Sequence, residues 1–135
     1  MLRLMALIVA ALATISDYCE NKLLDAVFNA TSFSVSNVYV KLHIGDPGEA
    51  GTANAAGNTS RQEATFPAAS GGAVSNDNTI TWTSVSTSET YSHISLWDNS
   101  TAGNCLWVGA LTAPKAVNAG DTFVIAVGDL DVTID

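Results

Sequence analysis

The sequence predicts a mainly β protein, an antiparallel β-sandwich or jelly roll that carries an α-helical arm at its N-terminus. Short segments in which apolar and polar side chains alternate recur along the chain between turn residues, a pattern typical of half-buried strands. Apolar side chains at helical spacing occur near the N-terminus. A chain of 135 residues is long enough for one domain with its own core. We divide it into an apolar arm and helix, residues 1–36, and a sandwich, residues 37–135.

The most apolar segment is residues 1–13, MLRLMALIVAALA. Its single arginine, short apolar run and Ala-x-Ala ending match a secretory signal peptide, and the run is short for a membrane span. We expect the segment to be retained and buried against its own domain or a neighbouring subunit, because an exposed apolar patch would drive aggregation. A signal peptide or membrane anchor is the alternative. The arm contributes these residues to a predicted interface: Leu4, Met5, Leu7, Ile8 and Leu12.

A helix is expected within residues 7–29. Ser16 is a suitable N-cap, and Asp17 and Glu20 place negative charge at the positive end of the helix dipole. Apolar residues then recur at helical spacing, beginning with Cys19. The remaining members of this stripe complete the predicted interface: Leu23, Leu24, Val27 and Phe28.

The clearest strand lies in residues 37–48, NVYVKLHIGDPG. Its aliphatic residues alternate with Tyr39, Lys41 and His43, which are expected to point outward, and Pro47 ends the strand because it lacks a backbone donor. Residues 49–60 are small and polar and are expected to form an exposed loop. The same alternation predicts further short strands over residues 61–66, 73–75, 79–85, 91–98, 105–112, 121–127 and 130–134, with a turn over 114–120.

Trp82, Trp97 and Trp107 each lie in the middle of a predicted strand. Large rings at such positions fill the space between two sheets, and stacking on carbohydrate is the alternative. Cys19 and Cys105 have no CxxC spacing and no histidine beside them. We expect both to be free and buried, with a disulfide as the alternative.

No residue pattern predicts catalysis or a cofactor. His43 and His93 are the only histidines, and the serines lack the GxSxG setting of a nucleophile elbow. Asp129, Asp131 and Asp135 alternate along the last strand without the glycine-centred loop of a calcium site, and are expected to be solvated. We therefore expect a protein that is not an enzyme and needs no cofactor or metal.

The charge balance argues against nucleic-acid binding. Thirteen acidic and 5 basic residues give a net charge of −8, and only 13% of residues are charged. Such a surface repels a phosphate backbone.

Four segments resemble a family of small tailed-phage virion proteins. The resemblance lies in an ENKLLD helix, a VYVKLHIGDPGEAG strand and turn, an RQEATFPAASGGAVSN segment and an LWVGALTAPKAVNAGDTF ending, which together span residues 16–135 in order. Residues 1–15 are longer and more apolar than the family pattern, and Ser60 replaces its usual tyrosine or alanine. The resemblance implies a virion structural protein, usually labelled tail-fibre or virion protein, and no catalytic residues.

Within a virion, we favour a cement or decoration protein on the outer capsid surface. It would bind the major capsid protein and stabilise neighbouring subunits, because the chain lacks repeats, a coiled-coil stalk and a second domain, and its net charge of −8 opposes packaged DNA. A tail-fibre or tail-tip protein is the alternative, and a secreted carbohydrate-binding sandwich is the second alternative. Self-association and assembly in the host cytoplasm are expected, with no membrane in the finished particle.

Overall fold

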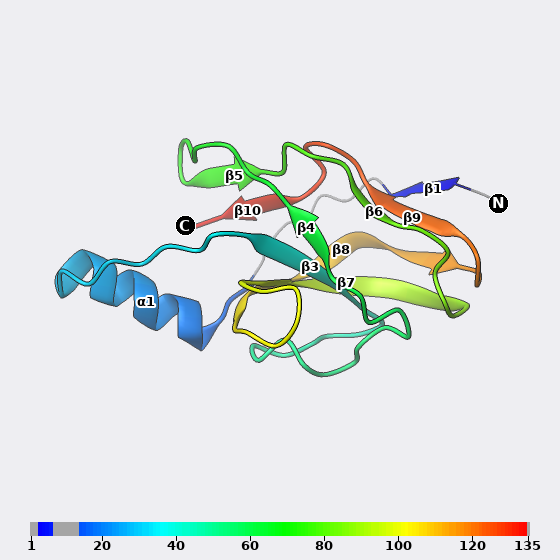
Figure 1. The fold of residues 1–135 in the computed structure, drawn as a ribbon, viewed down its shortest axis with the longest axis horizontal. Coiled ribbons are helices and arrows are strands. Elements are labelled where there is room, and N and C mark those ends of the chain that lie inside the picture. The colour runs from blue at the N-terminus through cyan, green and yellow to red at the C-terminus, as the bar shows by residue number, and fades with distance from the viewer. Residues whose placement is uncertain (1–2, 7–13, 135) are drawn as a thin grey trace.

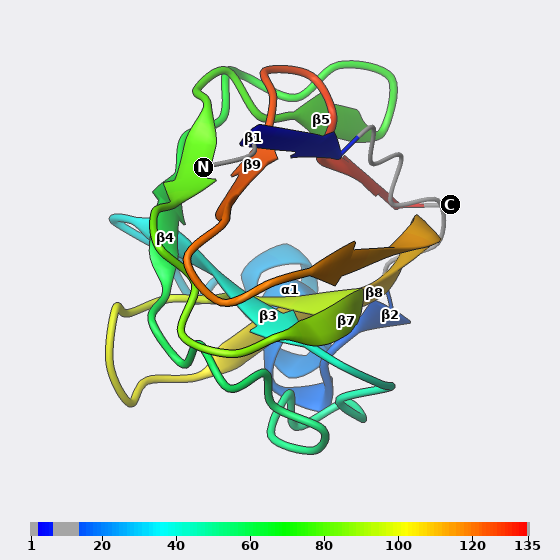
Figure 2. The same ribbon diagram turned by 90° about the vertical axis from the view of Figure 1, so that its right-hand side faces the viewer.

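Two layers of strands face each other across a hydrophobic core in the computed structural model, which describes residues 3–6 and 14–134 (Figures 1 and 2). In chain order the elements are β1 (Arg3–Ala6), β2 (Thr14–Ile15), α1 (Asp17–Phe28), β3 (Val38–His43), β4 (Gln62–Ala64), β5 (Ala73–Ser75), β6 (Ile80–Trp82), β7 (Glu89–Trp97), β8 (Cys105–Val117), β9 (Thr122–Ile125) and β10 (Asp131–Thr133).

One layer is a five-stranded antiparallel sheet in the order β2-β8-β7-β3-β4. The opposite layer combines a three-stranded sheet, β1-β9-β6, with a two-stranded sheet, β10-β5. Within this second layer β1 runs parallel to β9, and the other pairs are antiparallel. The described chain is therefore mainly β, with antiparallel sheets and an N-terminal helix, which confirms the predicted fold class.

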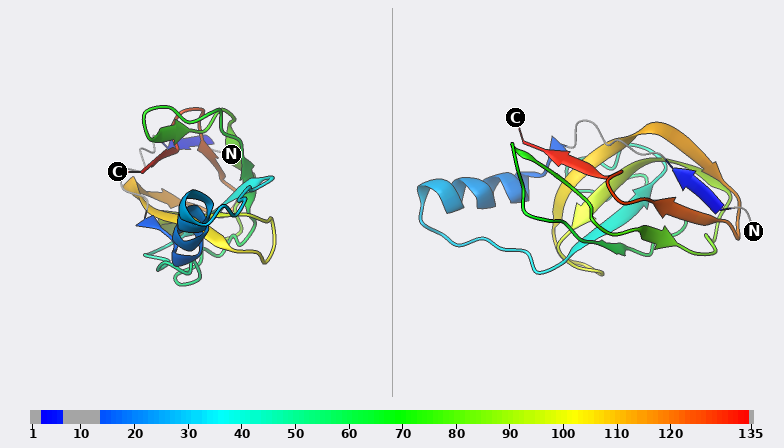
Figure 3. Two further views of the ribbon diagram at one scale, coloured as in Figure 1. Left: turned by 90° about the vertical axis from the view of Figure 1, so that its left-hand side faces the viewer. Right: turned by 90° about the horizontal axis from the view of Figure 1, so that it is seen from above.

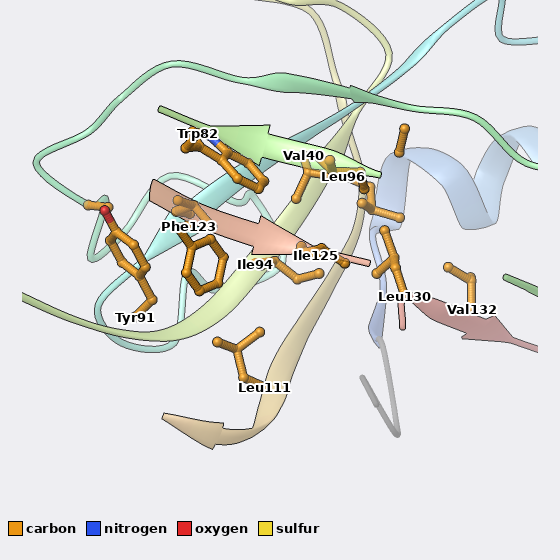
Figure 4. Close-up of a cluster of buried hydrophobic side chains, with 14 of the residues drawn as sticks. Val40, Trp82, Tyr91, Ile94, Leu96, Leu111, Phe123, Ile125, Leu130 and Val132 are labelled. Carbon is orange, nitrogen blue, oxygen red and sulfur yellow. The ribbon is translucent and has the colours of Figure 1, made fainter. Parts of the chain in front are cut away.

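Aromatic rings from three strands meet in the core between the layers. The ring of Phe123 on β9 lies 5.7 Å from that of Trp82 on β6 and 5.0 Å from that of Tyr91 on β7 (Figure 4). Aliphatic side chains from both layers surround these rings, among them Val40 and Ile125, and all five residues are at most 1% exposed. The alternation seen in the sequence thus places one face of each strand in this core.

The prediction that all three tryptophans fill the space between the sheets is confirmed for Trp82, holds in part for Trp107 and is wrong for Trp97. Trp107 is half-buried at the edge of the main core. Trp97 belongs to a separate cluster with Cys105 and Val108 on the other face of the five-stranded sheet. Residues one position apart along a strand point to opposite faces, so a tryptophan in the middle of a strand can serve either face.

Strand β8 is longer than predicted, because the expected turn over residues 114–120 begins only after Val117. The pairing with β7 shifts register between Tyr91 and His93, which face Lys115 and Ala110. The extra residues on β8 lie in this irregularity. Pro114 is one of them, and at this position its lack of a backbone N–H breaks no hydrogen bond between the strands.

The chain upstream of the helix forms strands at β1 and β2, and α1 begins at Asp17. The helix lies within the predicted range, and residues 7–13 lie outside the described residues. Both cysteines are free and buried, as expected. The loop over residues 49–60 is mostly exposed, as expected, but Gly51 and Ala56 are buried in it.

Tyr91 has a buried hydroxyl that finds no hydrogen-bond partner among the described residues. Burial raises the pKa of this hydroxyl to about 12, so it stays protonated at neutral pH. Leaving such a group unpaired costs about 1–3 kcal/mol.

We predict that Tyr91→Phe leaves the free energy of unfolding unchanged or raises it, because the variant keeps the ring and removes only the unpaired hydroxyl. Tyr91→Ala, which also removes the ring, should lower it by about 3–5 kcal/mol. Urea unfolding of both variants measures this. A loss of more than about 1 kcal/mol in Tyr91→Phe would show that the hydroxyl has a partner.

Candidate functional site

Helix α1 is fixed to the sandwich at its N-cap, Ser16, which is 2% exposed. The Ser16 backbone N–H donates to the carbonyl of Leu106 at 3.0 Å, and its hydroxyl donates to the carbonyl of Cys105 at 2.5 Å. The same hydroxyl accepts from the backbone N–H of Cys19 at 3.2 Å, which is the expected N-cap bond. One side chain thus joins the start of the helix to β8.

From this anchor α1 projects beyond the end of the sandwich, and residues 29–37 run back beside it to β3 (Figures 1 and 3). The near end of the helix is covered, since Cys19 is buried and Leu23 is half-buried. The far end is not covered by any described part of the chain. Three large apolar side chains there are exposed by 56%, 71% and 81%: Leu24, Val27 and Phe28.

An apolar groove of about 400 Å³ opens between the layers where the helix leaves the sandwich. Cys19 and Leu23 of α1 line one side, and Val74 and Val132 of β5 and β10 line the other. The groove is also lined by Ile134, whose side chain is 58% exposed. The groove and the exposed end of α1 together make this the apolar end of the molecule.

The nine predicted interface residues fall into separate places. Leu4 and Met5 lie in β1, opposite Phe123 and Val124 of β9. Of the helix residues, Leu23 lines the groove, whereas Leu24, Val27 and Phe28 lie at the exposed end. Leu7, Ile8 and Leu12 lie outside the described residues.

Two further groove residues, Phe33 and Val35, were missed. They belong to residues 30–36, a Ser- and Thr-rich, β-prone segment that was expected only to connect the helix to the first strand. The segment reads ATSFSVS, so Phe33 and Val35 are two positions apart, and this short alternation was the available signal.

Residues 45–61 pass over the outer face of the five-stranded sheet (Figure 2). Between this loop and the sheet lies a partly polar cluster of side chains that is separate from the main core. Trp97 donates from Nε1 to Ser95 Oγ at 2.7 Å, and Ser95 Oγ lies 2.7 Å from Nε2 of His43. His43 Nδ1 lies 2.9 Å from the carbonyl of Ala53. Since a carbonyl only accepts, Nδ1 carries a proton. Burial favours the neutral imidazole, in which Nε2 accepts from the Ser95 hydroxyl.

The prediction that His43 points outward into solvent is wrong, because the side chain is 0% exposed. The loop over residues 45–57 covers it, and β7 supplies Ser95 as a partner. Burial lowers the pKa of His43 to about 4, with smaller contributions from the charges of Lys41 and His93, against the opposing hydrogen bond to Ala53. His93, by contrast, is half-exposed on β7.

A cation covers this cluster. The Arg61 guanidinium lies 3.8 Å from the centre of the Trp97 ring and donates to the carbonyls of Asn99 and Ala102, each at 2.7 Å. Gly51 packs so closely below that an added Cβ would lie 2.5 Å from Cys105 Sγ, and its φ of +67° also requires glycine. The loops on this face are thus held firmly to the sheet.

A sequence model of the family described as Podophage GP4 fiber I protein gp80 matches residues 14–133. The chain belongs to this family. The assignment supports the resemblance to phage virion proteins, and the matched residues include α1 and all the described strands except β1. A search of curated proteins found no match.

The described residues contain no group of three or more His, Cys, Asp or Glu side chains placed to hold a metal ion. In the same part of the chain, no helix has the length and hydropathy needed to cross a bilayer.

We predict that the unfolding free energy falls as the pH drops from 6.5 to 4, because the unfolded state then takes up a proton that His43 in the folded state does not. The loss at His43 is at most about 3 kcal/mol. Chemical unfolding at pH 7 and pH 4.5 measures it. His43→Gln should flatten this dependence, whereas His93→Gln should retain it. Equal pH dependence in the wild type and His43→Gln would contradict the assignment.

Proposed function

We propose that the chain is a structural subunit of a phage fibre, and that copies associate through the end carrying α1. The observation that carries this proposal is the exposed end of the helix, where Leu24, Val27 and Phe28 are 56–81% exposed. Large apolar side chains gathered on one element are typical of a contact surface. The other large apolar side chains that are exposed in the described chain, Ile44, Val127 and Ile134, lie on separate elements, and a net charge of −8 gives little basis for salt bridges between copies.

The fibre alternative is favoured over the capsid surface. The family description supports a fibre protein, and the preference for a cement protein bound to the major capsid protein finds no support in it. A short helix that extends beyond its own sandwich suits end-to-end or side-by-side contacts between copies, because no described part of its own chain covers its apolar far end. The role we propose is structural, with no catalytic step, cofactor or nucleic-acid contact.

We predict that Phe28→Ser weakens self-association without unfolding the chain. Burying one phenylalanine side chain contributes about 1.5–3 kcal/mol, which corresponds to roughly ten- to hundredfold in a dissociation constant. Sedimentation velocity of the full chain over a range of concentrations measures the change.

The matched control is Val127→Ser, since Val127 is 57% exposed and lies on the turn after β9, away from the helix. It should self-associate like the wild type. A wild type that stays monomeric at all concentrations, or equal weakening by both variants, would contradict the proposed contact.

A further inference from the structure

A polar hollow of about 380 Å³ lies beside the near end of α1, separate from the apolar groove. Two phenol rings, Tyr18 of α1 and Tyr39 of β3, line it, together with the segment over residues 33–37. Its remaining side is the end of β7, where Asp98 and Asn99 begin the loop to β8. The volume falls within the range of roughly 300–1,000 Å³ found for small-molecule sites.

The Asp98 side of the hollow is held in place by bonds from its own loop. One oxygen of the Asp98 carboxylate accepts from the backbone N–H of Asn104 at 2.7 Å, and the other accepts from the Asn104 amide at 2.8 Å. Gly103 lies so close that an added Cβ would be 2.3 Å from Asp98 Oδ1. Arg61 binds the carbonyls of Asn99 and Ala102 from the other side. A site fixed in this way loses little entropy when a ligand binds.

Several polar groups around the hollow remain available to a ligand. The hydroxyls of Tyr18 and Tyr39 and the Nδ2 of Asn99 have no hydrogen-bond partner among the described residues. The Asn37 amide donates to Glu63, which fixes its orientation and leaves its oxygen free within the described part of the chain. The hollow thus offers donors and acceptors beside aromatic rings.

We propose that this hollow binds a neutral carbohydrate. Asp98 is the one charged side chain in its described lining and repels a phosphate or sulfate, whereas the lysine beside the hollow, Lys22, lies with Nζ 5.7 Å from the centre of the Tyr18 ring. An apolar ligand would leave the amides and hydroxyls unpaired. A sugar matches both parts of the lining, because its hydroxyls pair with amide, phenol and carboxylate groups while its C–H faces pack on the rings of Tyr18 and Tyr39. The site is distinct from the exposed end of α1.

The test probes an array of neutral oligosaccharides that end in glucose, galactose, mannose, rhamnose or N-acetylglucosamine, together with phosphorylated versions, using the full chain. The best-bound neutral compound is then titrated by calorimetry. We expect Tyr39→Phe and Asn99→Ala each to weaken binding by roughly two- to tenfold, as loss of one net hydrogen bond does. Tyr39→Phe keeps the ring, so its folding should be preserved.

Asn118→Ala is the matched control, since Asn118 is exposed on the β8–β9 turn, at the opposite end of the sandwich from α1 (Figure 1). It should bind like the wild type. Phe28→Ser should also bind the oligosaccharide like the wild type, because Phe28 lies outside the hollow. A failure of the proposed fibre contact can therefore be distinguished from a failure of this site. No binding to any neutral compound, stronger binding of the phosphorylated ones, or unchanged affinity in both site variants would overturn the proposal.

Discussion

The buried hydroxyl of Ser16 is the contact on which the arrangement of the functional surfaces depends. It donates to β8 and caps the first turn of α1 at the same time, so it sets both the position and the direction of the helix. A helix of 12 residues is at most marginally stable alone, and this one is held by its anchor, by Cys19 and Leu23 in the groove, and by the ring contact of Tyr18 with Phe33. The apolar groove, the exposed far end of α1 and the polar hollow all lie where they do because the helix leaves the sandwich in that direction.

The two faces of the five-stranded sheet are covered by side chains of different polarity. Its inner face packs against aromatic and aliphatic side chains of the second layer, where stability comes from apolar burial. Its outer face carries Trp97, Ser95 and His43 in a chain of hydrogen bonds that closes on the loop over residues 45–57. This polar network positions Arg61 and, through it, the loop that begins at Asp98. One side of the hollow is therefore joined to the sheet through Arg61, which stacks on Trp97 and binds the carbonyls of the Asp98 loop.

Alternation and turn residues were enough to locate β3 to β10, but β1 and β2 were missed, because their residues were expected in the apolar arm and the helix. The sequence could not show which face of the sheet a residue serves. His43 is expected outside because it alternates with Val40 and Leu42, yet a loop of small residues covers it. Trp97 and Ser95 lie on that same outer face of β7, and only the long-range pairing of β3 with β7 brings His43 to them. The helix was predicted from its cap and stripe, whereas the hollow needed the return of residues 33–37 beside Tyr18, which no local pattern encodes.

The exposed end of α1 is proposed to be a contact between copies within a fibre. Cryo-electron microscopy of the native particle can show both where the sandwich lies and what covers the helix. We expect adjoining copies in a fibre, with Leu24, Val27 and Phe28 buried between chains. Isolated copies spread over the capsid surface, with the far end of α1 in solvent or seated on the major capsid protein, would contradict it.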